Sequence, residues 1–275
     1  LIILADYYKL TGNRAYILEQ KDYIAQLLCM IDGCIAEDGS FDFGMNFVDW
    51  PTHGHRDEEE GVRSLCKLCA DKSLLLEELC GIGGGVAARI RKKMDARGAA
   101  VTEKRQIAAL KYFSHTPLSA AEKKILTEGG AHGFSTFMSY FLLSAVCENA
   151  DMKTALDALR RYYGGMLSMG ATTFWEDFDV DWMENSCPID RLCKEGERDI
   201  HGDFGRFCYE GYRHSLCHGW SAGVIPFLIE RVFGLKVEKA GFSEVTVSPD
   251  LGDLDFAEAK IPTPLGLLHI SCRKE

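Results

Sequence analysis

Acidic and aromatic residues are concentrated in one short stretch of this sequence, "GATTFWEDFDVDW" (170–182, the acidic segment). Glu176 follows Trp175 directly, and further acids and rings follow at Asp177, Phe178, Asp179, Asp181 and Trp182. A solvated loop explains the acids but not the rings, and a core segment explains the rings but not the acids. A sugar site uses both, because carboxyls catalyse glycoside hydrolysis and flat rings cover the C–H face of a pyranose. From spacing alone, Glu176 could equally cap a helix or pair with an arginine.

A second candidate stretch is "FVDWPTHGH" (47–55). Asp49 could accept hydrogen bonds from sugar hydroxyls, and Trp50 could offer a flat apolar face. Core packing is the alternative explanation for the rings of both Trp50 and Trp175. His53 and His55 have no third metal ligand in view, so we interpret them as solvated loop residues. The acids at 56–60 are explained by the start of a helix, whose dipole favours negative charge.

A third candidate is His218, which stands 42 residues after Glu176 (218 − 176) and begins an apolar run. A neutral imidazole can exchange hydrogen bonds with sugar hydroxyls, although a satisfied core histidine is the alternative. His214 lies four residues earlier and could share a helix face with His218. That spacing leaves a weak metal alternative open.

Composition restricts the class of protein. The chain has 275 residues, 47% of them hydrophobic, and a formal net charge of −10, so a nucleic-acid or anionic-membrane partner has no global electrostatic support. No apolar run is long enough to span a bilayer.

The eleven cysteines are an odd number and lie largely in helical apolar patterns. They favour free thiols in a reducing compartment such as the cytoplasm. Cys66 and Cys69 have CxxC form without a second pair at zinc-finger spacing, so we expect no metal there. We also expect no cofactor.

The elements that would position the candidate residues are mostly helices. Apolar residues recur at three-and-four spacing through most of the chain, as on one face of a helix. We predict helices over 1–10, 13–35, 61–80, 85–97, 103–114, from 119 onward, and over 134–149, 151–168 and 216–233. Ser119 and Asp151 should cap two of these helices, and Gly234 should end the last. After Gly234 the pattern alternates, which predicts strands around a turn at 263–266.

Loops and a basic turn complete the sequence pattern. Residues 37–60 and 170–215 form two long loops, where function concentrates. "LCGIGGGVAARI" (79–90) is similar to the turn of a helix-hairpin-helix DNA-binding motif, with Arg89, Arg91, Lys92 and Lys93 after it. Such a turn exposes N–H groups at a helix start, where phosphate binds. The acidic net charge favours the alternative, a glycine-rich link with a solvated basic face.

Three stretches together resemble one enzyme family. The acidic segment, "SLCHGWSAGVIPFLIERVFGL" (215–235) and "VTVSPDLGDLDFAEAKIPTPLGLLHIS" (245–271) look like the C-terminal part of a glycoside hydrolase family 78 α-L-rhamnosidase. "FVDWPT" (47–52) also resembles the Asp-Trp loop of that family. The resemblance covers nearly the whole chain, although residues 81–130 match only as helices.

The resemblance implies a fold and an activity. The fold would be mainly α: a partial (α/α)6 toroid of helical hairpins over residues 1–234, then a short β-sandwich-like tail over 235–275. The activity would be inverting removal of terminal α-L-rhamnose, or a related deoxy-sugar, from a glycan or glycoside. Glu176 would be the general base, and Asp49, Trp50, Trp175 and His218 would bind the sugar. A non-catalytic carbohydrate-binding relative would share the same aromatic residues.

The family's general acid is a glutamate on an earlier hairpin, and no stretch before residue 41 matches its motif. Leu1 opens an apolar run without a preceding methionine. We therefore expect the sequence to be part of a longer protein in which the acid lies upstream of Leu1. Hairpins absent from this sequence would leave apolar helix faces uncovered, so the chain could self-associate through the open edge of the barrel.

Overall fold

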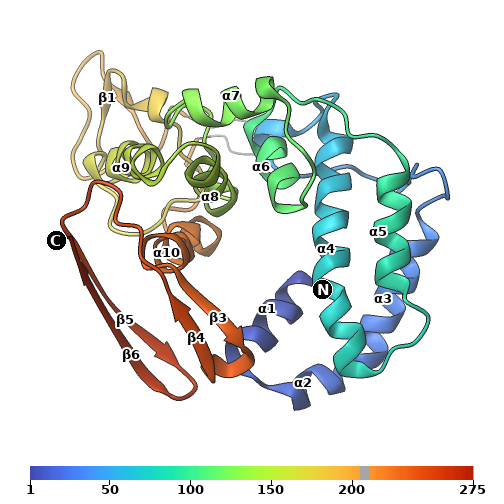
Figure 1. The fold of residues 1–275 in the computed structure, drawn as a ribbon. Coiled ribbons are helices and arrows are strands. Elements are labelled where there is room, and N and C mark those ends of the chain that lie inside the picture. Colours follow the sequence, from blue (N-terminus) through green and yellow to red (C-terminus); the bar gives the residue numbers. More distant parts are fainter. Residues whose placement is uncertain (205–210, 213, 275) are drawn as a thin grey trace.

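A computed structural model describes residues 1–204, 211–212 and 214–274, and shows a mainly helical molecule with a small β tail (Figure 1). Its α-helices are α1 (Ile2–Thr11), α2 (Arg14–Glu19), α3 (Lys21–Gly33), α4 (Glu58–Cys80), α5 (Val86–Ala96), α6 (Arg105–Phe113), α7 (Ala120–Glu128), α8 (Ser139–Asn149), α9 (Met152–Ser168) and α10 (Val224–Phe227). Short 3₁₀ turns are η1 (Trp50–Thr52), η2 (Val180–Met183), η3 (Gly219–Gly223) and η5 (Ala240–Phe242), and η4 (Leu228–Val232) is a π-helical turn.

The helices form a partial toroid of hairpins, as the family resemblance implied. Helices α1, α4, α6, α8 and α10 surround the centre of the molecule, and α3, α5, α7 and α9 lie outside them (Figure 1). Neighbouring inner helices pack in chain order, α1 on α4, α4 on α6, α6 on α8 and α8 on α10. Helices α5, α7 and α9 each cover the inner helix that precedes them in the chain. Because each hairpin reverses the chain, the loops before the inner helices gather at one end.

Several predicted helix boundaries are confirmed. Ser119 and Glu122 form a capping box at the start of α7, and the Asp151 carboxylate accepts the Thr154 N–H at the start of α9 (2.6 Å). Gly234 ends the last helical run in a left-handed conformation (φ 59°). A Cβ there would lie 1.8 Å from the carbonyl oxygen of Ser248, so only glycine fits.

Other boundaries were wrong, because loop contacts override helical periodicity. The predicted helix over 134–149 begins only at Ser139, since residues 135 and 136 form site contacts described below. The helix predicted from 216 begins at Gly219, because His218 is extended (φ −130°) and its N–H donates to the Phe174 carbonyl (2.7 Å). The helix predicted over 13–35 is interrupted at Gln20 between α2 and α3.

A glycine contact joins the two ends of the helical arrangement. Helix α1 packs against η5, where Gly12 and Gly241 both have positive φ (69° and 72°). A Cβ on Gly12 would lie 3.2 Å from the Cα of Gly241, and a Cβ on Gly241 would lie 3.3 Å from the Cα of Gly12. The close approach of these two backbones therefore depends on glycine at both positions.

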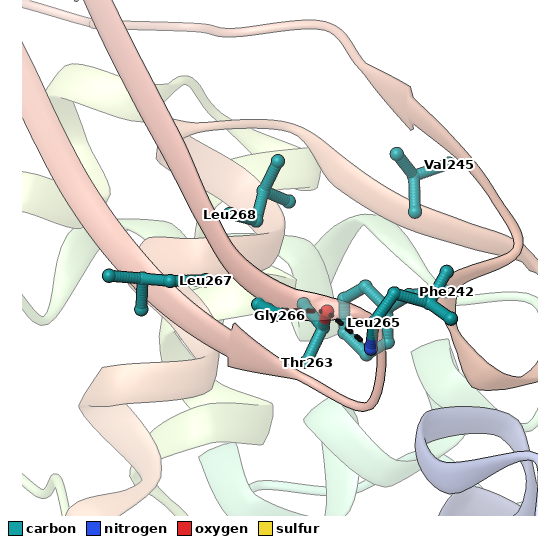
Figure 2. A pocket seen from close by; sticks show the side chains of 7 residues that line it. All are labelled: Phe242, Val245, Thr263, Leu265, Gly266, Leu267 and Leu268. Atoms are coloured by element: carbon teal, nitrogen blue, oxygen red, sulfur yellow. Dashed lines mark hydrogen bonds between the residues drawn. The ribbon is translucent and has the colours of Figure 1, made fainter.

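The β tail consists of two antiparallel hairpins that do not pair with each other: β3 (Leu235–Lys239) with β4 (Glu244–Val247), and β5 (Phe256–Thr263) with β6 (Gly266–Arg273). The predicted turn at 263–266 joins β5 and β6. Ile261 and Ile270 pack with Phe233 and Leu235 in a small core between the tail and the last helical turn. Figure 2 shows a shallow apolar hollow between the hairpins, lined by Phe242, Val245, Thr263, Leu265, Gly266, Leu267 and Leu268. The domain boundary at residue 234 stays a prediction.

The largest core lies among α6, α8, α9 and the acidic segment, and a second core lies among α1 to α5. Within the described ranges, no helix is both long and apolar enough to cross a membrane. The long loop 170–215 contains η2 and a short parallel pair, β1 (Ser186–Cys187) with β2 (Arg198–Asp199).

Candidate functional site

The Asp-Trp loop is held in place by its own polar side chains. Asp49 caps η1: its carboxylate accepts the Trp50 N–H (2.9 Å), and Thr52 completes a capping box. The buried carboxylate of Glu58 accepts the N–H groups of Val48 (3.3 Å) and Gly54 (3.0 Å). These bonds fix the turn that presents the half-buried ring of Trp50, whose centroid lies 5.7 Å from that of His53.

The acidic segment follows α9 and runs toward the end of the molecule where the loops preceding α4, α6 and α8 lie. Its aromatic rings pack into the main core. Trp175, Phe178 and Trp182 are buried there. Trp175 is only 1% exposed, so its ring has no face open to a sugar. The expected sugar-binding role of Trp175 is therefore corrected: it packs against Phe178, with ring centroids 5.9 Å apart.

Glu176 is half-buried and fixed from both its backbone and its side chain. Its carboxylate accepts the Ser215 N–H (2.7 Å), and its own N–H donates to the Ser215 carbonyl (2.8 Å). Its carbonyl accepts the indole N–H of Trp220 (2.8 Å) and the hydroxyl of Thr136. These four contacts come from two stretches outside the acidic segment: three fix the backbone of Glu176, and the Ser215 N–H orients its carboxylate.

His218 lies beside this carboxylate, and its predicted contact with a sugar stays a prediction. Its Nδ1 atom is 3.6 Å from Oε2 of Glu176, too far for a strong hydrogen bond but within ion-pair range. Its ring lies 4.4 Å from that of Trp220, which lies 5.3 Å from that of Phe137. Phe137 is 42% exposed, so a run of rings leads from Glu176 to solvent.

Asp49 belongs to the same end of the molecule as Glu176 but is itself buried, at 4% exposure. Its second carboxylate oxygen accepts the hydroxyl of Ser135. Burial raises the pKa of Asp49 to about 6, and the nearby Asp177 carboxylate adds to the rise, although Ser135 and the Trp50 N–H oppose it. Asp49 is thus placed to organise the loop, and direct contact with a sugar stays a prediction.

A cleft of about 470 Å³ lies between the Asp-Trp loop and the acidic segment. Its walls come from these two stretches, from the start of α6 and from the turn before α8: Pro51, His53, Gly54, His55, Lys104, Gly133, Phe134, Asp177, Phe178, Asp179 and Trp182. The two long loops identified in the sequence therefore meet at one end of the molecule. Asp177 and Asp179 face the cleft, whereas Glu176 faces Ser215 and His218.

His214 behaves differently from His218. It is 3% exposed, and its ring packs edge-on against that of His201 (4.7 Å between centroids). Burial lowers the pKa of His214 to about 4; His201 adds to the decrease and the Glu176 carboxylate opposes it. Among the described residues no cluster of three or more potential ligands could hold a metal, so the His214–His218 spacing builds no such site there.

The N–H groups and basic side chains of the turn at 79–93 find their partners within this chain. The N–H groups of Val86 and Ala87, at the start of α5, both donate to the Glu77 carboxylate (2.8 and 3.2 Å). A carboxylate of the chain thus occupies the place that a phosphate would take. Basic side chains nearby pair with acids, Arg89 with Asp32 and Arg91 with Asp71. These contacts speak against the helix-hairpin-helix interpretation.

The cysteines follow the prediction with one correction. Cys187 and Cys193 form a disulfide across a six-residue separation in the long loop. The prediction of free thiols missed this pair because both cysteines lie in the long loop 170–215, outside the helical apolar patterns on which that prediction rested. The other described cysteines are free, including Cys66 and Cys69. Burial raises the pKa of the Cys66 thiol to about 12, which makes it unreactive.

Sequence reasoning missed Ser135, Thr136, Ser215 and Trp220, which hold Asp49 and Glu176. Ser135 and Thr136 were assigned to a helix, and nothing in their spacing indicated a contact with distant loops. Ser215 and Trp220 flank His218 in the stretch that carried the family resemblance, and that was the only available signal.

Together, the partial helical toroid, the polar loops at one end and the β tail define a glycoside hydrolase-like fold. A "GH78 family rhamnosidase" of Bacillus sp. GL1 matches it with a TM-score of 0.69 at 23% identity, over 98% of this chain and 30% of that one. The α-L-rhamnosidase of Streptomyces avermitilis, solved with L-rhamnose, matches with a TM-score of 0.68 at 15% identity, over 98% of this chain and 26% of that one. The α-L-rhamnosidase of Dictyoglumus thermophilum matches with a TM-score of 0.63 at 16% identity, over 100% of this chain and 31% of that one.

These likenesses confirm the family resemblance at the level of the fold. This chain spans only 26–31% of the length of the three structures. No family model matches the sequence, and no curated protein does either.

Proposed function

We propose that this chain is part of an inverting glycoside hydrolase that removes terminal α-L-rhamnose, or a related deoxy-sugar, from glycans or glycosides. The observation that carries the proposal is the placement of Glu176. Its carboxylate is half-buried, oriented by the Ser215 N–H and next to His218, on the fold of known rhamnosidases.

Glu176 would activate the attacking water. In an inverting hydrolase the base stands about 6.5–9.5 Å from the acid, across the sugar ring, so that a water fits between base and sugar. His218 and the face of Trp50 would bind the sugar, with Asp49 supporting the loop that carries Trp50. We propose that the general acid is contributed by residues outside this sequence, since the three structural neighbours are more than three times as long.

The stereochemistry of the product tests this assignment. Hydrolysis of 2,4-dinitrophenyl α-L-rhamnoside by the longer protein of which we propose this chain is part, followed by ¹H NMR from the first seconds, should release β-L-rhamnose before mutarotation produces the α-anomer. Release of the α-anomer first would contradict an inverting mechanism. Binding of L-rhamnose without turnover of any aryl rhamnoside would instead identify a non-catalytic carbohydrate-binding relative.

A further inference from the structure

The disulfide between Cys187 and Cys193 contrasts with the other cysteines of this chain. Eight further described cysteines are free thiols, and two of them, Cys29 and Cys217, are exposed to solvent. Stable disulfides belong to oxidising surroundings, whereas abundant free thiols indicate reducing ones, in which the disulfides that form are mostly catalytic or redox-sensing. The Cys187–Cys193 pair is therefore a candidate for reversible reduction.

The two sulfur atoms of this disulfide differ in their access to solvent. Cys187 is 1% exposed and lies in β1, whereas Cys193 is exposed and lies between β1 and β2. A thiolate from solution can therefore reach Sγ of Cys193 and displace Sγ of Cys187 as the leaving group. The two cysteines are six residues apart, so their sulfurs stay near each other after the bond opens, which favours re-formation.

The turn that the disulfide closes packs against the start of the acidic segment. Within this turn, the Ile189 N–H donates to the Met169 carbonyl (3.0 Å). A Cβ on Gly170 would lie 2.9 Å from Cγ1 of Ile189, so the two stretches are in close contact. Arg191 binds the Glu197 carboxylate through two hydrogen bonds (2.6 and 2.8 Å). Because β2 begins one residue after Glu197, movement of the turn is transmitted to β2.

The residues of β2 and those after it hold the stretch that orients Glu176. The Asp199 carboxylate accepts the His201 N–H (2.9 Å). Nε2 of His201 lies 3.2 Å from the carbonyl oxygen of His214. Ser215, the next residue, donates its N–H to the Glu176 carboxylate (2.7 Å). A continuous series of contacts therefore connects the disulfide with the hydrogen bond from Ser215 that orients this carboxylate.

We propose that the Cys187–Cys193 disulfide is an exchange site for low-molecular-weight thiols, and that its reduction weakens the hydrogen bond from Ser215 to Glu176. The consequence for catalysis rests on the proposed function, whereas the exchange itself does not.

The exchange proceeds in two steps. In the first, the thiolate of the small molecule bonds to Sγ of Cys193, and Cys187 leaves as a thiolate that takes a proton from water. In the second, another small-molecule thiolate attacks the sulfur of the attached thiol, and Cys193 leaves as a thiolate that is also protonated. Two small thiols are thereby oxidised to one disulfide, and the protein disulfide is reduced to two thiols.

Mass spectrometry of this 275-residue protein tests the exchange. The probe is reduced glutathione at millimolar concentration, followed by alkylation of free thiols and digestion. At early times a glutathione adduct should appear on Cys193 and not on Cys187, because only Cys193 is exposed. At late times both cysteines should be alkylated. A disulfide that stays intact, or an early adduct on Cys187 instead, would overturn the proposal.

Hydrogen exchange at the Ser215 N–H tests the coupling to Glu176. Reduction with dithiothreitol should speed exchange of this amide about tenfold, as expected when one hydrogen-bonded contact is weakened. Cys193→Ser should exchange at the fast rate without reductant and should not respond to it. Cys29→Ser, at an exposed free thiol of α3, is the matched control and should behave as the parent does. Equal rates in the oxidised and the reduced parent would overturn the coupling.

Failure of this proposal and failure of the proposed function give different results. In the longer protein, reduction should slow hydrolysis of an aryl α-L-rhamnoside, and Cys193→Ser should hydrolyse it at one rate with and without dithiothreitol. If reduction speeds exchange at Ser215 while Glu176→Gln leaves hydrolysis unimpaired, the exchange site stands and the assignment of the base falls. If Glu176→Gln abolishes hydrolysis while reduction changes neither exchange nor rate, the base stands and the present proposal falls.

Discussion

Ser135 and Thr136 are consecutive, and their hydroxyls hold two parts of the site that lie 127 residues apart in sequence (176 − 49). Ser135 donates to the carboxylate of Asp49, and Thr136 donates to the backbone carbonyl of Glu176. The turn before α8 thus positions the Asp-Trp loop and the acidic segment relative to each other. A change at this turn should affect both loops without touching the candidate sugar-binding surface.

Thr136→Val should lower the free energy of unfolding by about 1 kcal/mol, the net contribution of one buried hydrogen bond. The loss should stay small because the Trp220 indole still donates to the same carbonyl. Urea unfolding measures the change. Thr127→Val, which removes an exposed hydroxyl bonded within its own helix, is the control and should be close to neutral. Equal effects of the two variants would show that the Thr136 bond contributes nothing specific.

Glu176→Gln should lower the catalytic rate by about 10²-fold or more, the usual range for loss of an acid–base group. Glutamine can still accept the Ser215 N–H, so the fold should be retained. Release of the phenol from an aryl α-L-rhamnoside provides the measurement, with the exposed Glu195→Gln as control. A variant with near-normal turnover would place the base elsewhere, with Asp177 and Asp179 next to be tested.

The rate at which this 275-residue chain hydrolyses a rhamnoside should depend strongly on the leaving group. 2,4-Dinitrophenolate departs without protonation, whereas methanol requires a general acid, which typically contributes about 10²–10⁴-fold. We therefore expect slow turnover of the dinitrophenyl α-L-rhamnoside and no measurable turnover of the methyl glycoside. Ready hydrolysis of methyl α-L-rhamnoside would mean that the acid lies within this chain, in 56–60 or 177–184.

Asp49→Asn should change how stability depends on pH. Burial raises the pKa of Asp49 to about 6, so between about pH 4 and 6 the unfolded carboxyl loses its proton while the folded one keeps it. Ionisation of Asp49 therefore costs stability as pH rises through this window, by up to about 3 kcal/mol. Relative to the parent, the variant should become more stable between pH 4 and 7, as measured by urea unfolding. A pH-independent difference would contradict the raised pKa, and the exposed Asp42→Asn is the control.

His214→Phe should change the pH dependence of stability in the opposite direction: relative to the parent, this variant should become more stable as the pH falls. Burial lowers the pKa of His214 to about 4, so as pH falls from 6.5 to 4 the unfolded imidazole gains a proton while the folded one stays neutral. The parent should lose up to about 3 kcal/mol of stability over this window. The variant cannot protonate, so its stability relative to the parent should increase toward low pH. His269→Phe, on the exposed β6 position, should show no such trend, and a shared trend would contradict the assignment.

Local sequence patterns determined the elements of this protein and the stretches that carry its candidate site. Apolar spacing identified the helices, and Ser119, Asp151 and Gly234 marked their ends, because capping depends on contacts within a few residues. The acids and rings of 170–182 and of the Asp-Trp loop identified candidate residues by type. The resemblance to rhamnosidases was readable because its motifs are contiguous.

Tertiary structure decided which of those side chains are exposed to a ligand and which contacts orient them. Trp175 and Trp50 are both tryptophans next to an acid, yet only Trp50 stays partly exposed, because the acidic segment packs its rings against α9. Glu176 and Asp177 are adjacent acids that face different surroundings. Ser135, Thr136 and Ser215 act across long sequence separations. Exposure and hydrogen-bond partners depend on the packing of residues far apart in the chain, so residue type and local spacing cannot determine them.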